Sequence, residues 1–166
     1  MRRPRHASVR CMTAENSNTD YMQIALDEAA AAARADEVPV GAVLVSATGE
    51  VLARAHNQMR SIKDPTAHAE ILVIRAACEK LGNERLTDCS LYVTLEPCPM
   101  CAGAIAEARL AKLFYGASDI KGGAVDNGVA LFHQKSCHHA PDIIGGLRER
   151  ECADLLKGFF ALRRNG

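Results

Sequence analysis

The stretch SLYVTLEPCPMCAGAIAEARLAKLFYGA, residues 90–117, contains the pattern that decides the fold. Its first six residues form a short apolar run rich in β-branched and aromatic side chains, which predicts a buried strand. Pro99 then suits the first turn of a helix, where no backbone N–H is needed, and the alanine-rich run to residue 110 continues that helix. KLFYGA at 112–117 predicts a further strand. A strand, a helix and a strand in succession predict a sheet with helices packed on its faces.

The rest of the chain extends this pattern in both directions. A first helix is predicted to start at a cap among Asn18, Thr19 and Asp20, and to stop at Pro39. Further predicted elements are a hairpin of strands at 40–46 and 51–57, a helix at 67–82, an edge strand at 142–146 and an amphipathic helix at 148–164. This order predicts an α/β fold, a three-layer α/β/α sandwich with a mixed five-stranded sheet. The loop SDIKGGAVDNG at 118–128 contains three glycines and is predicted to be mobile.

Composition and charge narrow the classes of function. The 166 residues suit one domain, and no apolar run approaches the roughly 18 residues of a membrane-spanning helix. Seven cysteines with no secretory segment before them indicate a reducing compartment, so we expect a cytoplasmic protein. We expect residues 1–18 to form a disordered basic tail and 19–166 a single domain. The first ten positions hold four arginines and no acid, so the remainder carries sixteen basic and twenty acidic side chains, which argues against a large nucleic-acid surface.

Cys98 and Cys101 stand at the predicted junction of strand and helix. Their spacing places both sulfurs on one side of the first helical turn, where the helix dipole and free N–H groups favour thiolates. The pair alone fits a redox site, half of a structural zinc site or part of a catalytic zinc site. A structural zinc site needs a fourth ligand, for which the candidates are Cys89, Cys137 and His138. The run from Cys137 to His139 also raises the possibility of a second metal site.

His68 and Glu70 favour the catalytic interpretation, because they begin the helix predicted at 67–82 in the same way. One histidine and two cysteines supply zinc with three tetrahedral ligands and leave the fourth position for water. Glu70 lies two residues from His68, where it can move protons near the metal without binding it. We therefore predict one zinc ion per chain, held by His68, Cys98 and Cys101, with Glu70 as the catalytic acid–base.

The combination of H-x-E with P-C-x-x-C is shared by the cytidine deaminase-like superfamily. Longer segments resemble the bacterial tRNA-specific adenosine deaminases more specifically: EVPVGAVLV at 37–45, DPTAHAEI at 64–71, LYVTLEPCPMCAGA at 91–104, FYGASDIKGGA at 114–124 and ECADLLKGFFALRR at 151–164. This resemblance, over about residues 20–164, implies a zinc-dependent deaminase domain. The five-stranded sheet flanked by helices that it implies agrees with the predicted element order.

The resemblance also implies a substrate and a set of contacts. The reaction would convert adenosine at wobble position 34 of a tRNA-Arg with an ACG anticodon to inosine, in a homodimer that binds the tRNA anticodon stem-loop and no membrane. Asn57 matches the residue that hydrogen-bonds the flipped base, and its amide can both donate and accept; the alternative is a turn residue at a strand end. The remaining candidates for base or RNA contact are Ala69, Glu96, Pro97, Asp119, Lys121, His138, His139, Arg163 and Arg164.

Two other functions remain open on these residues. A deaminase of a free nucleobase or nucleoside, such as guanine or cytosine, fits the zero net charge. The C-terminal FFALRR segment favours a large polyanionic partner instead. A zinc-stabilised binding module without catalysis would not need an unligated acid such as Glu70 beside its metal.

Overall fold

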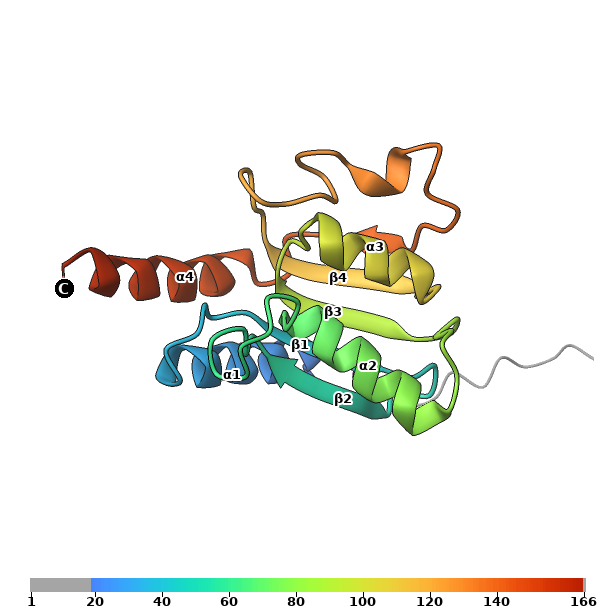
Figure 1. Cartoon of the computed structure of the whole chain (residues 1–166), viewed down its shortest axis with the longest axis horizontal. Helices are drawn as coiled ribbons and strands as arrows, with labels where there is room; N and C mark the ends of the chain where they lie inside the picture. Colours follow the sequence, from blue (N-terminus) through green and yellow to red (C-terminus); the bar gives the residue numbers. More distant parts are fainter. Residues whose placement is uncertain (1–18, 166) are drawn as a thin grey trace, which may run out of the picture.

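The computed structural model describes residues 19–165, and its elements follow the predicted order (Figure 1). They are α1 (Tyr21–Arg34), β1 (Gly41–Val45), β2 (Val51–His56), α2 (Ala69–Leu81), β3 (Ser90–Leu95), α3 (Pro99–Glu107), β4 (Lys112–Ala117), the 3₁₀ turn η1 (Leu131–His133), β5 (Asp142–Ile144) and α4 (Glu149–Arg164). The tail predicted at 1–18 lies outside the described residues. Within them, none of the helices has the length and apolar character needed to cross a membrane.

The five strands form one mixed sheet in the order β2-β1-β3-β4-β5. β1 runs antiparallel to both of its neighbours, β2 and β3. β4 runs parallel to β3 and to the short edge strand β5. The predicted hairpin therefore supplies the antiparallel half, and the strand–helix–strand unit at 90–117 supplies the parallel half through its crossover helix.

Helices cover both faces of the sheet, which confirms the predicted three layers. Side chains along a strand point alternately to opposite faces. In β1, Leu44 packs in a core with α2 and α3, whereas Val43 packs in a second core with α1 and α4. Because both faces are covered, every residue of β1 is buried.

The first helix ends earlier than the sequence predicted. Asp20 caps α1 through Oδ1, which accepts the Gln23 N–H at 3.0 Å, as one of the three candidate caps. The helix stops at Arg34 rather than at Pro39, because Asp36 adopts a positive φ of 63° and the Glu37 N–H turns back to the Ala32 carbonyl. The side chains of Asp36 and Glu37 thereby leave the helix and reach loops near the site described below.

The C-terminal helix packs against the sheet through its first turns. Cys152 is buried against Gly116 of β4, where a Cβ would lie 2.3 Å from the Cys152 sulfur, so only glycine allows this approach. Further along, the helix runs out beyond the sheet (Figure 1), and Phe160 and Leu162 are 45% and 79% exposed. The apolar face predicted for this helix is therefore only partly covered by the described residues.

Candidate active site

Two helix N-termini meet at one edge of the sheet. His68 is the N-cap residue of α2 and Cys98 is the N-cap residue of α3, both with extended backbone. Neither side chain makes a capping hydrogen bond, so both are free to point into the site. The sequence prediction that these residues open the two helices is confirmed. The positive ends of both helix dipoles consequently favour negative charge at this edge.

The three predicted metal ligands lie together. His68 Nδ1 is 3.6 Å from Cys98 Sγ and 3.5 Å from Cys101 Sγ, and all three ligand atoms lie within 4.8 Å of one another. Tetrahedral zinc, with Zn–N near 2.0 Å and Zn–S near 2.3 Å, requires nitrogen and sulfur ligands about 3.5 Å apart. The spacing and the donor types therefore fit a zinc-type ion.

No fourth protein ligand completes the triad within residues 19–165. Among these residues, His68, Cys98 and Cys101 form the one cluster of three or more metal-binding side chains. Cys89, Cys137 and His138, the candidates for a structural site, do not join it. The run at 137–139 forms no second cluster of that kind. The described ligand set thus matches a catalytic site with an open position rather than a closed structural one.

The thiols of Cys98 and Cys101 have very different pKa values. A hydrogen bond from Cys101 is the main cause that lowers the pKa of Cys98 to about 4, and a hydrogen bond from His68 helps. The same bond between the sulfurs, together with burial, raises the pKa of Cys101. The hydrogen bond with Cys98 also raises the pKa of His68. A metal that binds here displaces these protons, because a coordinating thiol is fully deprotonated.

Glu70 lies in the first turn of α2 beside the triad and is only 3% exposed. Its Oε2 atom is buried without a hydrogen-bond partner among the described residues. Burial raises the pKa of Glu70 to about 7, although a backbone N–H and the charge of His68 act against it. A carboxyl group that titrates near neutrality and has a free oxygen is suited to accept and return a proton.

A pocket of about 210 Å³ connects these groups. Asn57, His68, Glu70 and Cys98 contribute to its lining. Asn57 is 6% exposed, and its Oδ1 accepts the Ala69 N–H at 2.9 Å. Since a backbone N–H requires an acceptor, this bond orients the amide and leaves Nδ2 as the group available to a ligand. The Ala69 N–H is thus bound to Asn57 and is not available to a ligand.

The backbone polar groups of Glu96 and Pro97, in the turn between β3 and α3, are also hydrogen-bonded within the protein. The Glu96 N–H donates to the Ala117 carbonyl at 2.8 Å, and the Pro97 carbonyl accepts the Ala124 N–H at 2.9 Å. The Glu96 side chain is 2% exposed and binds the loop at 118–127. Burial alone would raise the pKa of Glu96, but hydrogen bonds from Asp119 and Asn127 hold it below its ordinary value.

Asp119 lies in the wall of the pocket, and Lys121 lies in the wall of the adjoining groove. Asp119 lines the pocket, and its Oδ1 accepts the N–H groups of Lys121 and Gly122. An open groove of about 590 Å³ adjoins the pocket and shares four lining residues with it: Val38, Leu95, Asp119 and Gly122. Leu156 and Phe160 of α4 form the far side of that groove.

His138 and His139 lie apart from the metal triad, in a separate cavity beside the last turns of α3. Arg109 Nη1 donates to the His138 carbonyl at 3.1 Å, and His139 Nε2 lies 2.7 Å from the Leu110 carbonyl oxygen. The structure therefore brings neither histidine to the pocket that holds Glu70 and Asn57.

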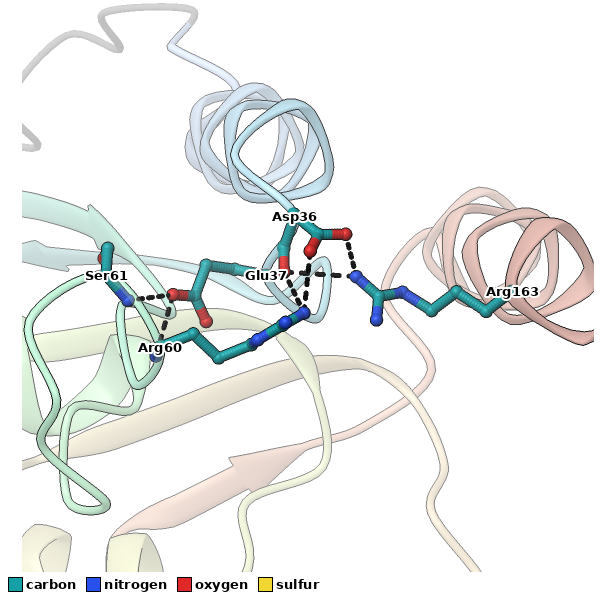
Figure 2. A network of polar contacts seen from close by, with 5 residues as sticks. All are labelled: Asp36, Glu37, Arg60, Ser61 and Arg163. Carbon is teal, nitrogen blue, oxygen red and sulfur yellow. Dashed lines mark hydrogen bonds and ion pairs between the residues drawn. The ribbon is translucent and has the colours of Figure 1, made fainter. Parts of the chain in front are cut away.

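Arg163 is engaged within the protein. Figure 2 shows Asp36 between Arg60 and Arg163, with Glu37 facing the loop that follows β2. The Arg163 guanidinium also lies 4.2 Å from the centre of the Phe159 ring. Glu37 Oε1 accepts the N–H groups of Arg60 and Ser61 at 2.8 and 2.7 Å. This network joins the end of α1, the loop after β2 and the end of α4.

Sequence reasoning missed part of the pocket wall. The additional lining residues are Val38, Val40, Met59, Leu95 and Gly122. Val38 and Val40 belong to the segment EVPVGAVLV, and Leu95 ends the strand before Glu96, so their places next to known motifs were the available signal. Met59 carries no such signal, because its place depends on the path of the loop after β2.

Comparisons with known proteins agree with this geometry. A family model for MafB19-like deaminases matches residues 16–164. A tRNA-specific adenosine deaminase of Agrobacterium fabrum is 58% identical over 146 residues, which are 88% of this chain and 95% of the relative. A solved tRNA:A34 deaminase, studied for A-to-I editing at the wobble position of transfer RNA, is 59% identical with a TM-score of 0.81. The match covers 82% of this chain and 98% of that one. A guanine deaminase from Bacillus subtilis is 32% identical with a TM-score of 0.58, over 90% of this chain and 94% of that one.

The fold and the site together define a hydrolytic deaminase of the cytidine deaminase-like class, with a histidine–cysteine–cysteine metal centre. More than half of the residues are shared with a relative that the alignment covers almost end to end. The chain belongs to the MafB19-like deaminases, and among them to the tRNA-specific adenosine deaminase family.

Proposed function

We propose that this protein converts adenosine to inosine at wobble position 34 of tRNA, and that its substrate is a tRNA-Arg with an ACG anticodon. One observation supports a polynucleotide more than any other. The pocket that contains Asn57 and Glu70 is small, yet it shares Asp119 and Gly122 with a wide groove beside α4. A single base fits the pocket while the attached strand occupies the groove, as base flipping requires.

The chain's own residues suit the reaction. One zinc ion per chain, held by His68, Cys98 and Cys101, would supply an acidified water at its open position. Glu70 accepts a proton from the water that adds to C6 of adenine and delivers it to N1 of the ring. The other proton of the same water, now on the C6 hydroxyl, passes to the exocyclic nitrogen as the C6–N6 bond breaks. Ammonia leaves and the C6 carbonyl of inosine forms, so that water and adenosine give inosine and ammonia. A carboxyl pKa of about 7 suits both directions of transfer at neutral pH.

In the proposed reaction, Asn57 and the apolar walls of the pocket bind the base. The Ala69 N–H occupies Asn57 Oδ1, so Nδ2 donates to an acceptor on the purine. Val38, Val40 and Leu95 supply apolar walls that exclude water from the reacting carbon. Lys121 lies along the adjoining groove, where it is placed to meet a phosphate. Arg163 is held by Asp36 and would reach RNA only by exchanging that partner.

A free-base deaminase is the second candidate. The 32% identity to a guanine deaminase and the zero net charge favour it. The test compares five substrates at equal enzyme concentration: a tRNA-Arg anticodon stem-loop with an ACG anticodon, the same stem-loop with a GCG anticodon, free guanine, free cytosine and adenosine. We expect inosine in the ACG stem-loop alone. Activity confined to guanine or cytosine would refute the proposed substrate.

We further propose that the enzyme works as a homodimer in the cytoplasm. The described cysteines are all free, as a reducing compartment would keep them. Light scattering on the zinc-loaded protein tests the dimer, for which we expect about twice the mass of one chain at micromolar concentration. A mass equal to one chain would contradict this proposal.

A further inference from the structure

The loop between β4 and η1 separates the pocket from the groove. Asp119 and Gly122 of this loop line both spaces, and Ile120 and Lys121 line the groove. Three glycines in the loop predict mobility, but the structure buries its centre: Ala124 and Val125 are both 0% exposed. A segment this rich in glycine needs specific partners to hold one conformation, since glycine loses the most conformational freedom on ordering.

The carboxylate of Glu96 is that partner. Its two oxygens accept six hydrogen bonds from one loop. Oε2 accepts from the Asp119 N–H at 2.9 Å, the Asn127 Nδ2 at 2.7 Å and the Ser118 hydroxyl at 3.4 Å. Oε1 accepts from the N–H groups of Val125 at 3.2 Å, Asp126 at 2.9 Å and Asn127 at 2.9 Å. Both ends of the loop are therefore bound to one side chain that comes from the end of β3.

The loop backbone lies directly on this carboxylate. A Cβ at Gly123 would stand 2.5 Å from Glu96 Cδ and 2.4 Å from the Asp119 carbonyl oxygen, so only glycine fits between them. The neighbouring Ala124 N–H donates to the Pro97 carbonyl at 2.9 Å. The loop is consequently fixed to the same turn that carries Cys98.

The negative charge of Glu96 suits its surroundings, which consist of hydrogen-bond donors. A carboxylate offers acceptors on both oxygens, and all six of its partners are donors. Glutamine has the same size but replaces one oxygen by an NH₂ group. In either orientation that NH₂ would face N–H donors of the loop: three backbone N–H groups at the Oε1 position, or the Asp119 N–H and Asn127 Nδ2 at the Oε2 position. A glutamine at this position therefore removes accepted bonds and leaves buried donors without a partner.

We propose that Glu96 is a positioning residue for substrate recognition, which binds the loop at 118–127 so that Asp119 and Gly122 complete, together with Val38 and Leu95, the wall shared by the pocket and the groove. This inference rests on the proposed polynucleotide substrate. Glu96 contributes to the lining of the pocket, but both of its carboxylate oxygens are engaged by the loop rather than by the reacting atoms. It acts through the loop, so its loss weakens substrate binding more than the chemical step.

The test is the Glu96→Gln variant of the full chain, loaded with zinc. On the ACG stem-loop we expect KM to rise about tenfold with kcat within about twofold of wild type, because the lost bonds act on binding. Zinc content should stay equal to wild type. Hydrogen exchange at the amides of Asp119 and 125–127 should become at least about tenfold faster. Unchanged exchange, unchanged KM, loss of zinc or a fall in kcat alone would each overturn the proposal.

Two control variants separate positioning from general destabilisation. Glu79→Gln makes the same chemical change on the exposed side of α2 and should leave KM and exchange unchanged. Leu86→Ala removes a buried side chain next to the C-terminal end of α3, where the Leu86 N–H bonds the Ala108 carbonyl at 2.7 Å. It should lower the melting temperature without raising KM. A KM increase in Leu86→Ala equal to that in Glu96→Gln would overturn the positioning role.

A milder variant serves if Glu96→Gln does not fold. Asn127→Ala removes the Nδ2 donor to Glu96 and to the Ser118 hydroxyl while keeping the carboxylate. We expect a smaller shift of KM and of loop exchange in the same direction, and no shift would refute the proposal. Failure of the wild-type enzyme on the stem-loop would refute the proposed function instead. The exchange measurement would still decide whether Glu96 holds the loop.

Discussion

Asn57 performs two functions in this structure, and two substitutions separate them. Its Oδ1 accepts the N–H of Ala69, a fully buried residue at the start of α2, and its Nδ2 is left for the substrate. Asn57→Ala removes both groups. Asn57→Asp keeps an acceptor for the Ala69 N–H, at a helix N-terminus where a carboxylate is favoured, but it removes the donor. Comparison of the two variants therefore measures the structural bond and the substrate bond independently.

The magnitudes follow from the cost of an unpaired group. In Asn57→Ala the buried Ala69 N–H loses its acceptor, which should lower the free energy of unfolding by about 1–3 kcal/mol. For a chain of this size each kcal/mol lowers the melting temperature by about 2–4 °C. Asn57→Asp should stay within about 1 kcal/mol of wild type. On the ACG stem-loop its kcat/KM should fall about 10- to 100-fold, because the purine acceptor loses a donor worth about 1–3 kcal/mol.

The assays are calorimetric unfolding of the zinc-loaded protein and single-turnover inosine formation. The expected pattern is a large activity loss in both variants with a stability loss in Asn57→Ala alone. Wild-type kcat/KM in Asn57→Asp would show that Nδ2 does not contact the base. Equal destabilisation of the two variants would show that the stability loss does not come from the missing acceptor for the Ala69 N–H.

Three further predictions concern the metal, the proton transfer and acid stability. Cys98→Ala should lower the zinc content from about one per chain to well below half, measured by atomic emission after dialysis, since zinc needs its thiolate ligands; full retention would remove Cys98 from the ligand set. Glu70→Gln should keep zinc and the melting temperature but lower kcat by about 10²- to 10⁴-fold, the usual contribution of general acid–base catalysis; a kcat near wild type would exclude Glu70 from proton transfer. Burial acts to raise the pKa of Glu28, but hydrogen bonds from His56 and Arg54 lower it overall. The ionised Glu28 therefore stabilises the fold at pH values above the ordinary pKa of a glutamate, and this contribution is lost as the pH falls through the lowered pKa of the folded state. Glu28→Gln should therefore lose stability at pH 7, and the difference from wild type should shrink as the pH falls below the ordinary pKa of a glutamate; a difference that does not change with pH would contradict the linkage.

Local sequence patterns were enough to predict most of the fold and the metal ligands. Short apolar runs marked the strands, Pro99 marked the start of a helix, and the i,i+3 spacing placed Cys98 beside Cys101. These features depend on neighbours within one or two turns of chain, so their physical causes can be read from residues close in sequence. The joint presence of His68 and Glu70 then indicated which kind of metal site the helices form.

The roles of Glu96 and Arg163 required the tertiary structure. From the sequence, Glu96 and Arg163 were candidates for contact with the base or the RNA, and the loop at 118–128 was expected to be mobile. In the structure, the Glu96 carboxylate binds the loop, and Asp36 pairs with Arg163 across 127 positions of the chain. Such contacts depend on which loops the packed sheet brings together, and no local pattern encodes that. The sequence by itself determined the elements and the metal ligands, whereas packing over long sequence distances decided which polar groups remain available to the substrate.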